Sequence, residues 1–288
     1  MSLNEKISNK SVLKKLYRII YYVIIKRHFY GITSSLRILP DFIIIGSMRS
    51  GTTSLNFDLP QHPCIGAPAY DEIGFFDSNF ELGLNWYRSM FPSIFTKYWT
   101  IFRKKYFLTG EDTPFYFWNP VAAKRIFETL PNVKLIILLR NPIDRAYSHY
   151  NNAVRIGVEK FPFEEQIKKE LDSLKSSNEA NYERFVKQPS YLAVGIYADQ
   201  LQIWTKLFKW EQLLIISTED LEKTPIQTLN SVFKFLNLPE YEVKNPEKRK
   251  AAKYDKMNPK TREMLIEYFR PHNEKLYKMI GKRFDWDK

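Results

Sequence analysis

The sequence predicts an α/β fold: a central, mainly parallel sheet between two layers of helices. Two observations lead to this prediction. Short, nearly continuous apolar runs alternate with stretches of helical periodicity, which is the pattern of a parallel sheet with crossover helices. A glycine-rich turn follows the first apolar run directly. At 288 residues the chain is long enough to bury a large core in one domain.

Three apolar runs are the candidate strands of this sheet. Each consists almost entirely of isoleucine and leucine, without polar alternation, as is typical of strands that are buried on both faces. The predicted strands are Phe42–Ile45, Lys134–Leu139 and Leu213–Ser217.

Helices are expected between and after these strands. Apolar residues recur there at spacings of three and four, which indicates one buried face on each helix. The sets are Ala122, Ala123, Ile126, Phe127 and Leu130; then Leu229, Val232, Phe233 and Leu236; and finally Met264, Leu265, Tyr268 and Phe269. Residues 41–288 thus form one predicted domain, and residues 1–40 precede it as a basic and apolar extension.

The net charge and the cysteine and histidine content indicate which ligands and which cellular location to expect. Lysine and arginine exceed aspartate and glutamate by 44 − 32 = 12, which suits an anionic ligand but also a merely soluble, lysine-rich surface. Cys64 is the single cysteine, so no internal disulfide can form. A reducing, cytoplasmic location is expected, and a secreted protein without disulfides is the alternative. The four histidines are scattered along the chain and no metal site is expected.

The extension carries one apolar run, Ile19–Ile25, between basic residues. About 20 apolar residues are needed to cross a bilayer, so the run is too short to span one. It also lacks the small-residue cleavage site of a signal peptide. Peripheral membrane contact through residues 11–30 and a helix that packs on the domain or forms a mobile arm are the open alternatives.

The stretch "DFIIIGSMRSGTTSL" (residues 41–55) is P-loop-like. Its Gly-x4-Gly-x-Thr spacing matches the phosphate-binding loop of nucleotide-binding proteins except at the lysine, which is replaced by Thr52. Backbone N–H groups of such a loop and the start of the following helix attract anions. Arg49 supplies a positive charge within the loop. A smaller anion than a triphosphate, such as a phosphosulfate, is therefore expected.

A second anion site is predicted in "KLIILLRNPIDRAYSHYNN" (residues 134–152). Arg140 ends the predicted strand, Asn141 is a good helix N-cap and Pro142 is a good first helical residue. Arg140 should therefore lie at the same sheet edge as the P-loop-like turn. Together with Ser148, two helical turns further on, it suits a phosphate. The alternative is a structural salt bridge and a serine bonded to its own helix.

Four segments in register resemble a known family: "IIIGSMRSGTTSL", "DEIGFFD", "LLRNPIDRAYSHY" and "MNPKTREMLIEYFRPHNEKLYKMIGKRFDW". Together they resemble the sulfotransferases that use 3′-phosphoadenosine-5′-phosphosulfate (PAPS), most of all the heparan sulfate N- and 3-O-sulfotransferases and their bacterial relatives. The resemblance covers most of residues 41–288. It implies transfer of a sulfuryl group from PAPS to an acceptor hydroxyl, with a glycan as the expected acceptor and without a metal.

The resemblance also implies which residues bind PAPS. Arg49 replaces a lysine of most relatives and would act as an electrostatic clamp on the leaving phosphate. The 3′-phosphate would bind Arg140 and Ser148. A basic C-terminal loop, which contains Lys250, Lys253 and Tyr254, would close over it, although Ala252 replaces a glycine of the relatives. The 5′-phosphosulfate loop falls on Arg49, Ser50, Gly51, Thr52 and Thr53, followed by Ser54.

The family's general base, a glutamate before two phenylalanines, falls on Glu72 in "YDEIGFFDSNF", with Asp77 as a supporting acid. Several neighbouring positions depart from the heparan enzymes and leave the acceptor open among glycan, lipid, small-molecule and carrier-bound hydroxyls. These departures are Asp71, Gly74, Asp112 in "GEDTPFY" and Asn152.

Two other functions compete with sulfuryl transfer. A P-loop kinase or NTPase is disfavoured by Thr52, and a non-catalytic polyanion-binding or membrane-docking protein on the same fold is permitted by the basic excess. Nucleic acid is not an expected partner, because no recognition helix or RNA-binding motif is visible. The oligomeric state is left open.

Overall fold

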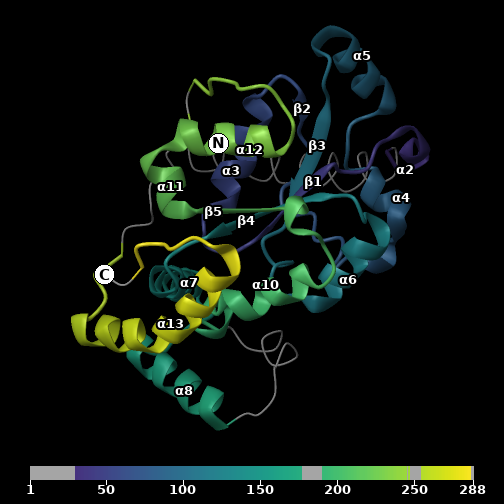
Figure 1. Cartoon of the computed structure of the whole chain (residues 1–288). Helices are drawn as coiled ribbons and strands as arrows, with labels where there is room; N and C mark the ends of the chain where they lie inside the picture. The colour runs from purple at the N-terminus through teal and green to yellow at the C-terminus, as the bar shows by residue number, and fades with distance from the viewer. Residues whose placement is uncertain (1–29, 177–189, 245, 247–253, 287–288) are drawn as a thin grey trace, which may run out of the picture.

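A computed structural model describes residues 30–176, 190–244, 246 and 254–286. A single five-stranded parallel sheet lies at the centre, with the strands in the order β2-β3-β1-β4-β5 (Figure 1). The strands are β1 (Phe42–Gly46), β2 (Ile65–Gly66), β3 (Leu108–Asp112), β4 (Lys134–Leu139) and β5 (Leu213–Ser217). The three predicted strands are confirmed, whereas β2 and β3 were not predicted.

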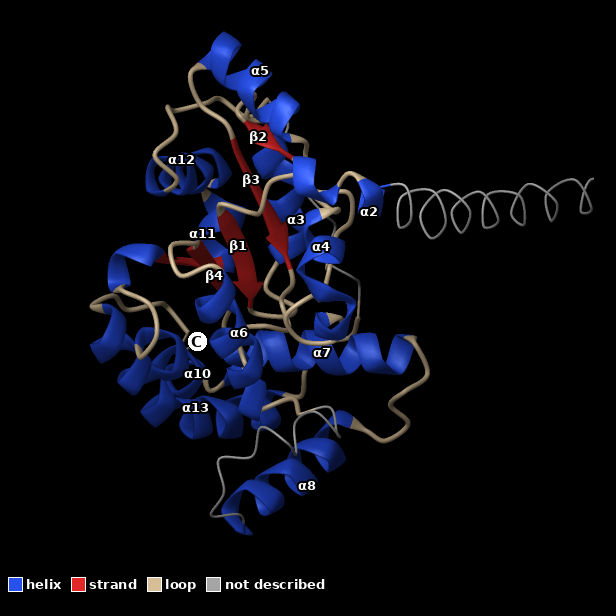
Figure 2. Cartoon of the chain, turned by 90° about the vertical axis from the view of Figure 1, so that its right-hand side faces the viewer, coloured by secondary structure: helices blue, strands red, loops and turns tan. Residues whose placement is uncertain are grey.

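Helices cover both faces of the sheet, which confirms the three-layer α/β/α prediction (Figures 1 and 2). Parallel strands need crossover connections, and every connection between successive strands contains at least one helix. The helices are α2 (Tyr30–Ile32), α3 (Thr52–Asp58), α4 (Gly83–Arg88), α5 (Ile94–Lys104), α6 (Pro120–Thr129), α7 (Pro142–Arg155), α8 (Phe163–Ser176), α10 (Tyr197–Thr205), α11 (Thr218–Lys223), α12 (Pro225–Phe235) and α13 (Pro259–Ile280).

Alternate residues of the central strands point into two separate cores. Ile43 and Ile137 belong to the core shared with α6, α10 and the end of α13, while Ile44 and Ile136 belong to the core shared with α3 and α12. All four are fully buried, and each contributes about 1.5–3 kcal/mol by leaving water. Burial on both faces explains why these strands read as unbroken apolar runs.

The predicted helix faces are mostly confirmed. Ala122, Ala123 and Ile126 of α6 are buried, as are Leu229, Val232 and Phe233 of α12. Met264 at the start of α13 is an exception: 43% of it is exposed, and the buried stripe runs instead through Leu265 and Phe269. That stripe packs against α7 and the segment around Tyr191 rather than against the sheet.

All five strands are parallel, so their carboxyl ends lie at one edge of the sheet. Strands β1 and β4 are neighbours, and the connection that leaves β1 runs to β2 on one side while the connection that leaves β4 runs to β5 on the other. Open α/β sheets bind their ligands at such a switch point, outside the carboxyl ends. No helix within the described residues is both long and apolar enough to cross a bilayer.

Candidate active site

The turn after β1 approaches its neighbours too closely for any side chain at its first position. A Cβ atom on Gly46 would lie 2.5 Å from the Cβ of Phe117 and 3.0 Å from the carbonyl oxygen of Pro114. Gly51 has a φ of 87°, in the left-handed region that favours glycine, and caps α3. Helix α3 begins at Thr52, directly after the turn. The two glycines therefore allow the sharp turn from β1 into α3.

Hydrogen bonds hold this turn in one conformation. The Ser47 and Ser50 hydroxyl oxygens are 2.7 Å apart, and the Ser47 amide donates to the Leu138 carbonyl at 2.6 Å. The buried Thr218 hydroxyl, at the start of α11, lies 2.7 Å from the Ser50 carbonyl and 3.2 Å from the Leu139 carbonyl. Thr218 was not predicted as a site residue, although its position directly after the predicted strand 213–217 marks this sheet edge.

Arg49, Arg140 and Ser148 come together beside the turn. Arg49 donates from Nε and Nη2 to the Ser148 Oγ at 3.3 and 3.2 Å, and Arg140 Nη1 donates to the Arg49 carbonyl at 3.2 Å. Burial lowers the pKa of Arg49, and the positive charges of Arg140 and Arg155 lower it further. Within the described residues, neither Arg49 nor Arg140 forms an ion pair with a carboxylate. The two predicted anion sites are therefore adjacent.

Backbone geometry explains how Arg49 reaches across the site. Its φ is 69°, a conformation that non-glycine residues adopt at a cost of order 1–3 kcal/mol. Such strain is found mostly where surrounding structure enforces it, often at functional sites. Here the bonds of Ser47, Ser50 and Thr218 described above hold the turn on either side of Arg49.

Helix α7 presents Ser148, and its start is fixed as predicted. The Asn141 side chain accepts from the Ile143 amide at 3.0 Å, and Pro142 is the first helical residue. The Arg140 carbonyl accepts from the Tyr197 hydroxyl at 2.9 Å. Ser148 is 4% exposed, so its hydroxyl lies inside the site rather than on the helix surface.

Helix α7 carries two further basic side chains near Ser148 in sequence, Arg145 and His149. Arg145 is fully buried; its Nη2 donates to the Tyr191 carbonyl, and its Nε and Nη1 have no hydrogen-bond partner among the described residues. Burial, together with the charges of Arg145 and Arg49, lowers the pKa of His149 to about 3, so this imidazole is neutral. Sequence reasoning missed Arg145, because nothing in the pattern of α7 marks it as a buried cation.

Glu72 lies on an exposed turn that packs against α3 and the end of β3. Its φ is 51°, and its carboxylate makes no hydrogen bond or ion pair with any described residue. On either side the turn is anchored: Asn56 of α3 donates to Asp71 at 2.9 Å, and the Gly74 amide donates to the Thr113 hydroxyl at 3.1 Å. Partial burial raises the pKa of Glu72, and the neighbouring Asp71 raises it further.

Asp77 lies at the end of the segment that carries Glu72. Its carboxylate accepts from the Ser78 amide, and Arg125 donates to the carbonyls of Phe76 and Asp77 at 3.0 and 3.3 Å. Burial raises the pKa of Asp77. These contacts fix the turn that carries Glu72, while the supporting-acid role of Asp77 stays a prediction.

Glu111, within the quoted segment "GEDTPFY", was not singled out by the sequence, yet it is fully buried at the end of β3. It accepts from the hydroxyls of Tyr87 at 2.6 Å, Thr113 at 2.9 Å and Tyr116 at 3.4 Å. Burial raises the pKa of Glu111 to about 7. Two partners of Glu111 also hold the turn that carries Glu72. The Thr113 hydroxyl accepts from the Gly74 amide, and the Tyr116 hydroxyl accepts from the Phe76 amide.

The predicted C-terminal loop is only partly visible. Lys250, Ala252 and Lys253 lie outside the described residues. Tyr254 packs edge-on against Tyr147 of α7, with ring centroids 5.4 Å apart. Tyr254 is also close enough to Arg49 for the charge of the tyrosine to raise the pKa of Arg49. The chain therefore returns to the anion site just after the loop.

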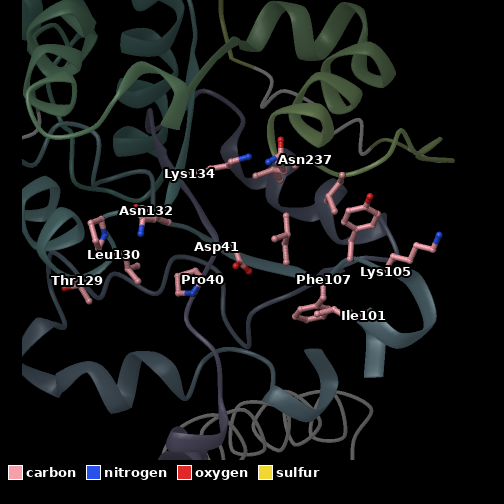
Figure 3. A pocket seen from close by; sticks show the side chains of 16 residues that line it. Pro40, Asp41, Ile101, Lys105, Phe107, Thr129, Leu130, Asn132, Lys134 and Asn237 are labelled. Carbon is pink, nitrogen blue, oxygen red and sulfur yellow. The ribbon is translucent and has the colours of Figure 1, made fainter. Parts of the chain in front are cut away.

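A separate cavity lies away from this site. It has a volume of about 670 Å³ and lies at the amino ends of the strands, where Pro40, Asp41, Phe107 and Lys134 line it (Figure 3). Its position places it at the opposite edge of the sheet from Gly46–Thr53. It is not part of the anion site. Among the described residues, no group of three or more histidine, cysteine, aspartate or glutamate side chains is arranged to hold a metal.

A parallel α/β sheet with a lysine-free, glycine-rich loop and two arginines at its carboxyl edge is the arrangement of a protein class that binds anionic ligands at the switch point. Residues 39–288 match the family model described as the sulfotransferase domain. The chain belongs to the sulfotransferase family and is a sulfotransferase enzyme.

Named relatives agree with this assignment. The chain is 29% identical to the membrane-associated sulfotransferase kil1 of Dictyostelium discoideum, over 88% of this chain and 68% of that protein. It is 30% identical to the bifunctional heparan sulfate N-deacetylase/N-sulfotransferase 3 of Mus musculus, over 84% of this chain but only 30% of that protein's length. A sulfotransferase crystal structure from Alicyclobacillus acidocaldarius superposes with a TM-score of 0.65 at 29% identity, covering 87% of this chain and all of that one.

Proposed function

We propose that this sulfotransferase transfers the sulfuryl group of PAPS to an acceptor hydroxyl, with Glu72 as the general base. The observation that carries the proposal is the convergence of Arg49, Arg140 and Ser148 beside the loop Gly46–Thr53. One ligand with anionic groups at both ends can engage both halves of this cluster. PAPS carries a phosphosulfate at its 5′ end and a phosphate at its 3′ end.

The residues present fit such a ligand. Guanidinium groups that are partly buried and lack a carboxylate partner among the described residues repel one another, and an anion relieves that repulsion. The buried Arg145, with two guanidinium nitrogens unpartnered in the described chain, adds to the positive potential. Charge-assisted hydrogen bonds from arginine to phosphate are among the strong ones in proteins. A triphosphate is disfavoured because Thr52 takes the place of the P-loop lysine.

Each residue then has a defined task. PAPS supplies the sulfuryl group when bound. Arg140 and Ser148 hold the 3′-phosphate, and the backbone N–H groups of the loop hold the 5′ end. Glu72 accepts the acceptor's hydroxyl proton as the oxygen–sulfur bond forms. Arg49 neutralises charge on the 5′-phosphate oxygen as its bond to sulfur breaks, in the manner of an oxyanion hole.

A glycan is the acceptor class that we propose. It is supported by relatives named for heparan sulfate N-sulfotransferase activity. The turn that carries Glu72 is exposed, which suits an extended acceptor that need not be enclosed. Asp71 and Gly74 differ from the heparan enzymes, and Asp71 adds negative charge next to the base. We therefore expect a less anionic glycan than heparan sulfate to be preferred.

The test is a transfer assay with purified full-length protein and radiolabelled PAPS against a panel of neutral glycans, heparan-type glycans, lipids and small alcohols. The proposal predicts transfer to at least one glycan and its loss in Glu72→Gln. Transfer that prefers a lipid or a small alcohol would contradict the acceptor class. Tight nucleotide binding without transfer to any acceptor would favour a binding protein that has lost catalysis.

A further inference from the structure

Helix α5 exposes an aromatic face that no described part of the chain covers. Phe95, Trp99 and Phe102 lie at spacings of three and four along it, so they share one face. They are 69%, 63% and 84% exposed, and Tyr98 beside them is 63% exposed. Isolated apolar side chains are common on surfaces, but a contiguous aromatic stripe marks an interaction site.

The same helix carries only positive charge. The segment from Ser93 to Tyr106 contains Lys97, Arg103, Lys104 and Lys105 and no aspartate or glutamate. Arg103 lies over the Trp99 ring, 5.7 Å from its centroid. Basic residues next to exposed tryptophan and phenylalanine are the composition of helices that lie in a membrane interface.

Local interactions stabilise α5 with little help from a core. Ser93 caps its start by accepting from the Thr96 amide at 3.1 Å, and Arg103 and Lys104 in the last turn complement the helix dipole. None of its eleven residues is buried. The helix projects from the body near β2 and the start of β3, in both views of the chain (Figures 1 and 2). The helix therefore protrudes from the body, although Ile101 and the C-cap Lys105 at its C-terminal end also line the 670 Å³ cavity.

We propose that α5 docks this sulfotransferase on the surface of a membrane that contains anionic phospholipids. The aromatic face inserts at the boundary between headgroups and acyl chains. Lys97, Arg103, Lys104 and Lys105 contact the negatively charged headgroups. Each basic residue near such a surface contributes favourable binding that weakens as salt is added.

Two other candidates could cover this face of α5, namely a second copy of the chain and residues 1–29, and the charge of each argues against it. A second copy paired through α5 would bring four basic side chains against four more, a like-charge arrangement that disfavours association. Residues 1–29 of this chain carry five lysines and two arginines against one glutamate, so they too would be repelled. An anionic bilayer attracts both segments.

A residue near the start of the described chain also lies beside the N-cap of α5. Arg37 pairs with Ser93, the N-cap of α5, in an isolated bridge, and the Arg37 guanidinium donates to the Phe91 carbonyl at 2.7 Å.

Docking through α5 has a consequence for the active site. Helix α5 precedes β3 and lies beyond the amino ends of the strands, whereas Gly46–Thr53 follows the carboxyl end of β1 (Figure 2). A membrane bound by α5 therefore leaves the anion site facing away from the bilayer. A soluble nucleotide and a glycan that extends from the surface can both reach it.

The test is co-sedimentation of the full-length protein with vesicles of phosphatidylcholine, with and without phosphatidylserine. The proposal predicts binding that requires phosphatidylserine and weakens with salt. The triple variant Phe95→Gln, Trp99→Gln, Phe102→Gln should bind such vesicles on the order of tenfold more weakly or worse. Phe161→Gln, which removes an exposed aromatic ring just before α8, is the matched control and should bind like the wild type.

Two further measurements distinguish loss of membrane binding from misfolding and from another partner on this face. Adenosine 3′,5′-bisphosphate affinity should be unchanged in the triple variant, since α5 is remote from the anion site. Trp99→Phe should still sediment with vesicles but should lose the fluorescence quenching that acyl-brominated lipids cause in the wild type. Equal vesicle binding by the wild type and a folded triple variant would overturn the proposal. A concentration-dependent dimer that disappears in the triple variant would overturn it as well.

Discussion

At the scale of single residues, Arg49 connects the two halves of the anion site. Its carbonyl accepts from Arg140, and its guanidinium donates to Ser148, so one residue touches both of the others. A lysine at this position could not donate from two nitrogens to the same hydroxyl oxygen. Arg49 thus ties the loop Gly46–Thr53 to the two residues that we propose bind the 3′-phosphate.

Glu72 is the residue on which catalysis should depend. Glu72→Gln preserves the size of the side chain but cannot accept a proton, so sulfuryl transfer should fall by about two to four orders of magnitude. Bisphosphate affinity should be unaffected, because the base acts on the acceptor. Transfer rates and calorimetry on both proteins measure the two effects, and near-wild-type transfer by the variant would assign the base elsewhere.

The pH profile gives an independent check on the same residue. Only the deprotonated carboxylate can act, so transfer should decline as pH falls through the pKa of Glu72. Because burial and Asp71 raise that pKa from 4.5, the decline should lie above pH 4.5. Asp71→Asn removes one raising charge and should move the decline to lower pH. If the transfer rate of Asp71→Asn declined at the same pH as that of the wild type, a group other than Glu72 would control the pH dependence.

At the scale of elements, the start of α11 braces the anion loop through Thr218. Thr218→Val keeps the shape of the side chain but removes the hydroxyl that lies within bonding distance of the carbonyls of Ser50 and Leu139. Chemical denaturation should show a loss of about 1–3 kcal/mol, since buried carbonyls lose a donor. Bisphosphate affinity should fall too. Thr224→Val, which removes an exposed hydroxyl that donates to a carbonyl nearby, should change neither.

Strand β3 buries an acid whose protonation couples to stability. Glu111 has a pKa of about 7 in the folded protein, against 4.5 for a solvated carboxyl. Between these values the folded state binds the proton more tightly than the unfolded chain, so the free energy of unfolding should fall as pH rises from 4.5 to 7. The Glu111 contribution is about 3 kcal/mol over this range.

Glu111→Gln should remove that part of the pH dependence, as measured by denaturation at several pH values between 4.5 and 8. Glu128→Gln on the exposed face of α6 is the control and should keep the wild-type slope. Identical slopes for Glu111→Gln and the wild type would mean that Glu111 is ionised in the folded protein throughout.

The same strand shows where sequence reasoning reaches its limit. Strands β1, β4 and β5 could be predicted because burial on both faces demands unbroken apolar runs. Strand β3 reads "LTGED", and its charged residues are buried only because tertiary partners such as Tyr87 satisfy Glu111. Helix α5 is the converse case: its apolar spacing would indicate a core-facing stripe, yet that stripe is exposed.

The site could be predicted as far as local geometry determines it. The loop after β1, the cap Asn141 and the placement of Arg140 at a strand end all follow from chain-local rules. Thr218 and Arg145 could not be assigned in this way, because their importance arises from contacts between elements far apart in sequence.

At the scale of the whole molecule, the two edges of the sheet have different surroundings. The carboxyl edge holds the arginine cluster, and the amino edge holds the 670 Å³ cavity and α5. Every residue proposed to act in catalysis belongs to the carboxyl edge or to the loop before α13.

Deletion of residues 1–29 should therefore leave transfer to a soluble acceptor nearly unchanged. The truncation stops before Tyr30 so that the bond from Arg37 to the Phe91 carbonyl is kept. Steady-state rates of the truncated and full-length proteins make the comparison. A truncated protein that binds the bisphosphate normally but no longer transfers would place part of the acceptor site in the extension.

The central claim is that the carboxyl edge recognises a nucleotide with anionic groups at both its 3′ and 5′ ends. Calorimetry of adenosine 3′,5′-bisphosphate and of AMP, on the wild type and on Arg140→Ala, tests it most directly. One charge-assisted contact is worth about 1.5–3 kcal/mol, so the wild type should prefer the bisphosphate by roughly tenfold or more, and Arg140→Ala should lose most of that preference. Equal affinity of the wild type for the two nucleotides would contradict the account.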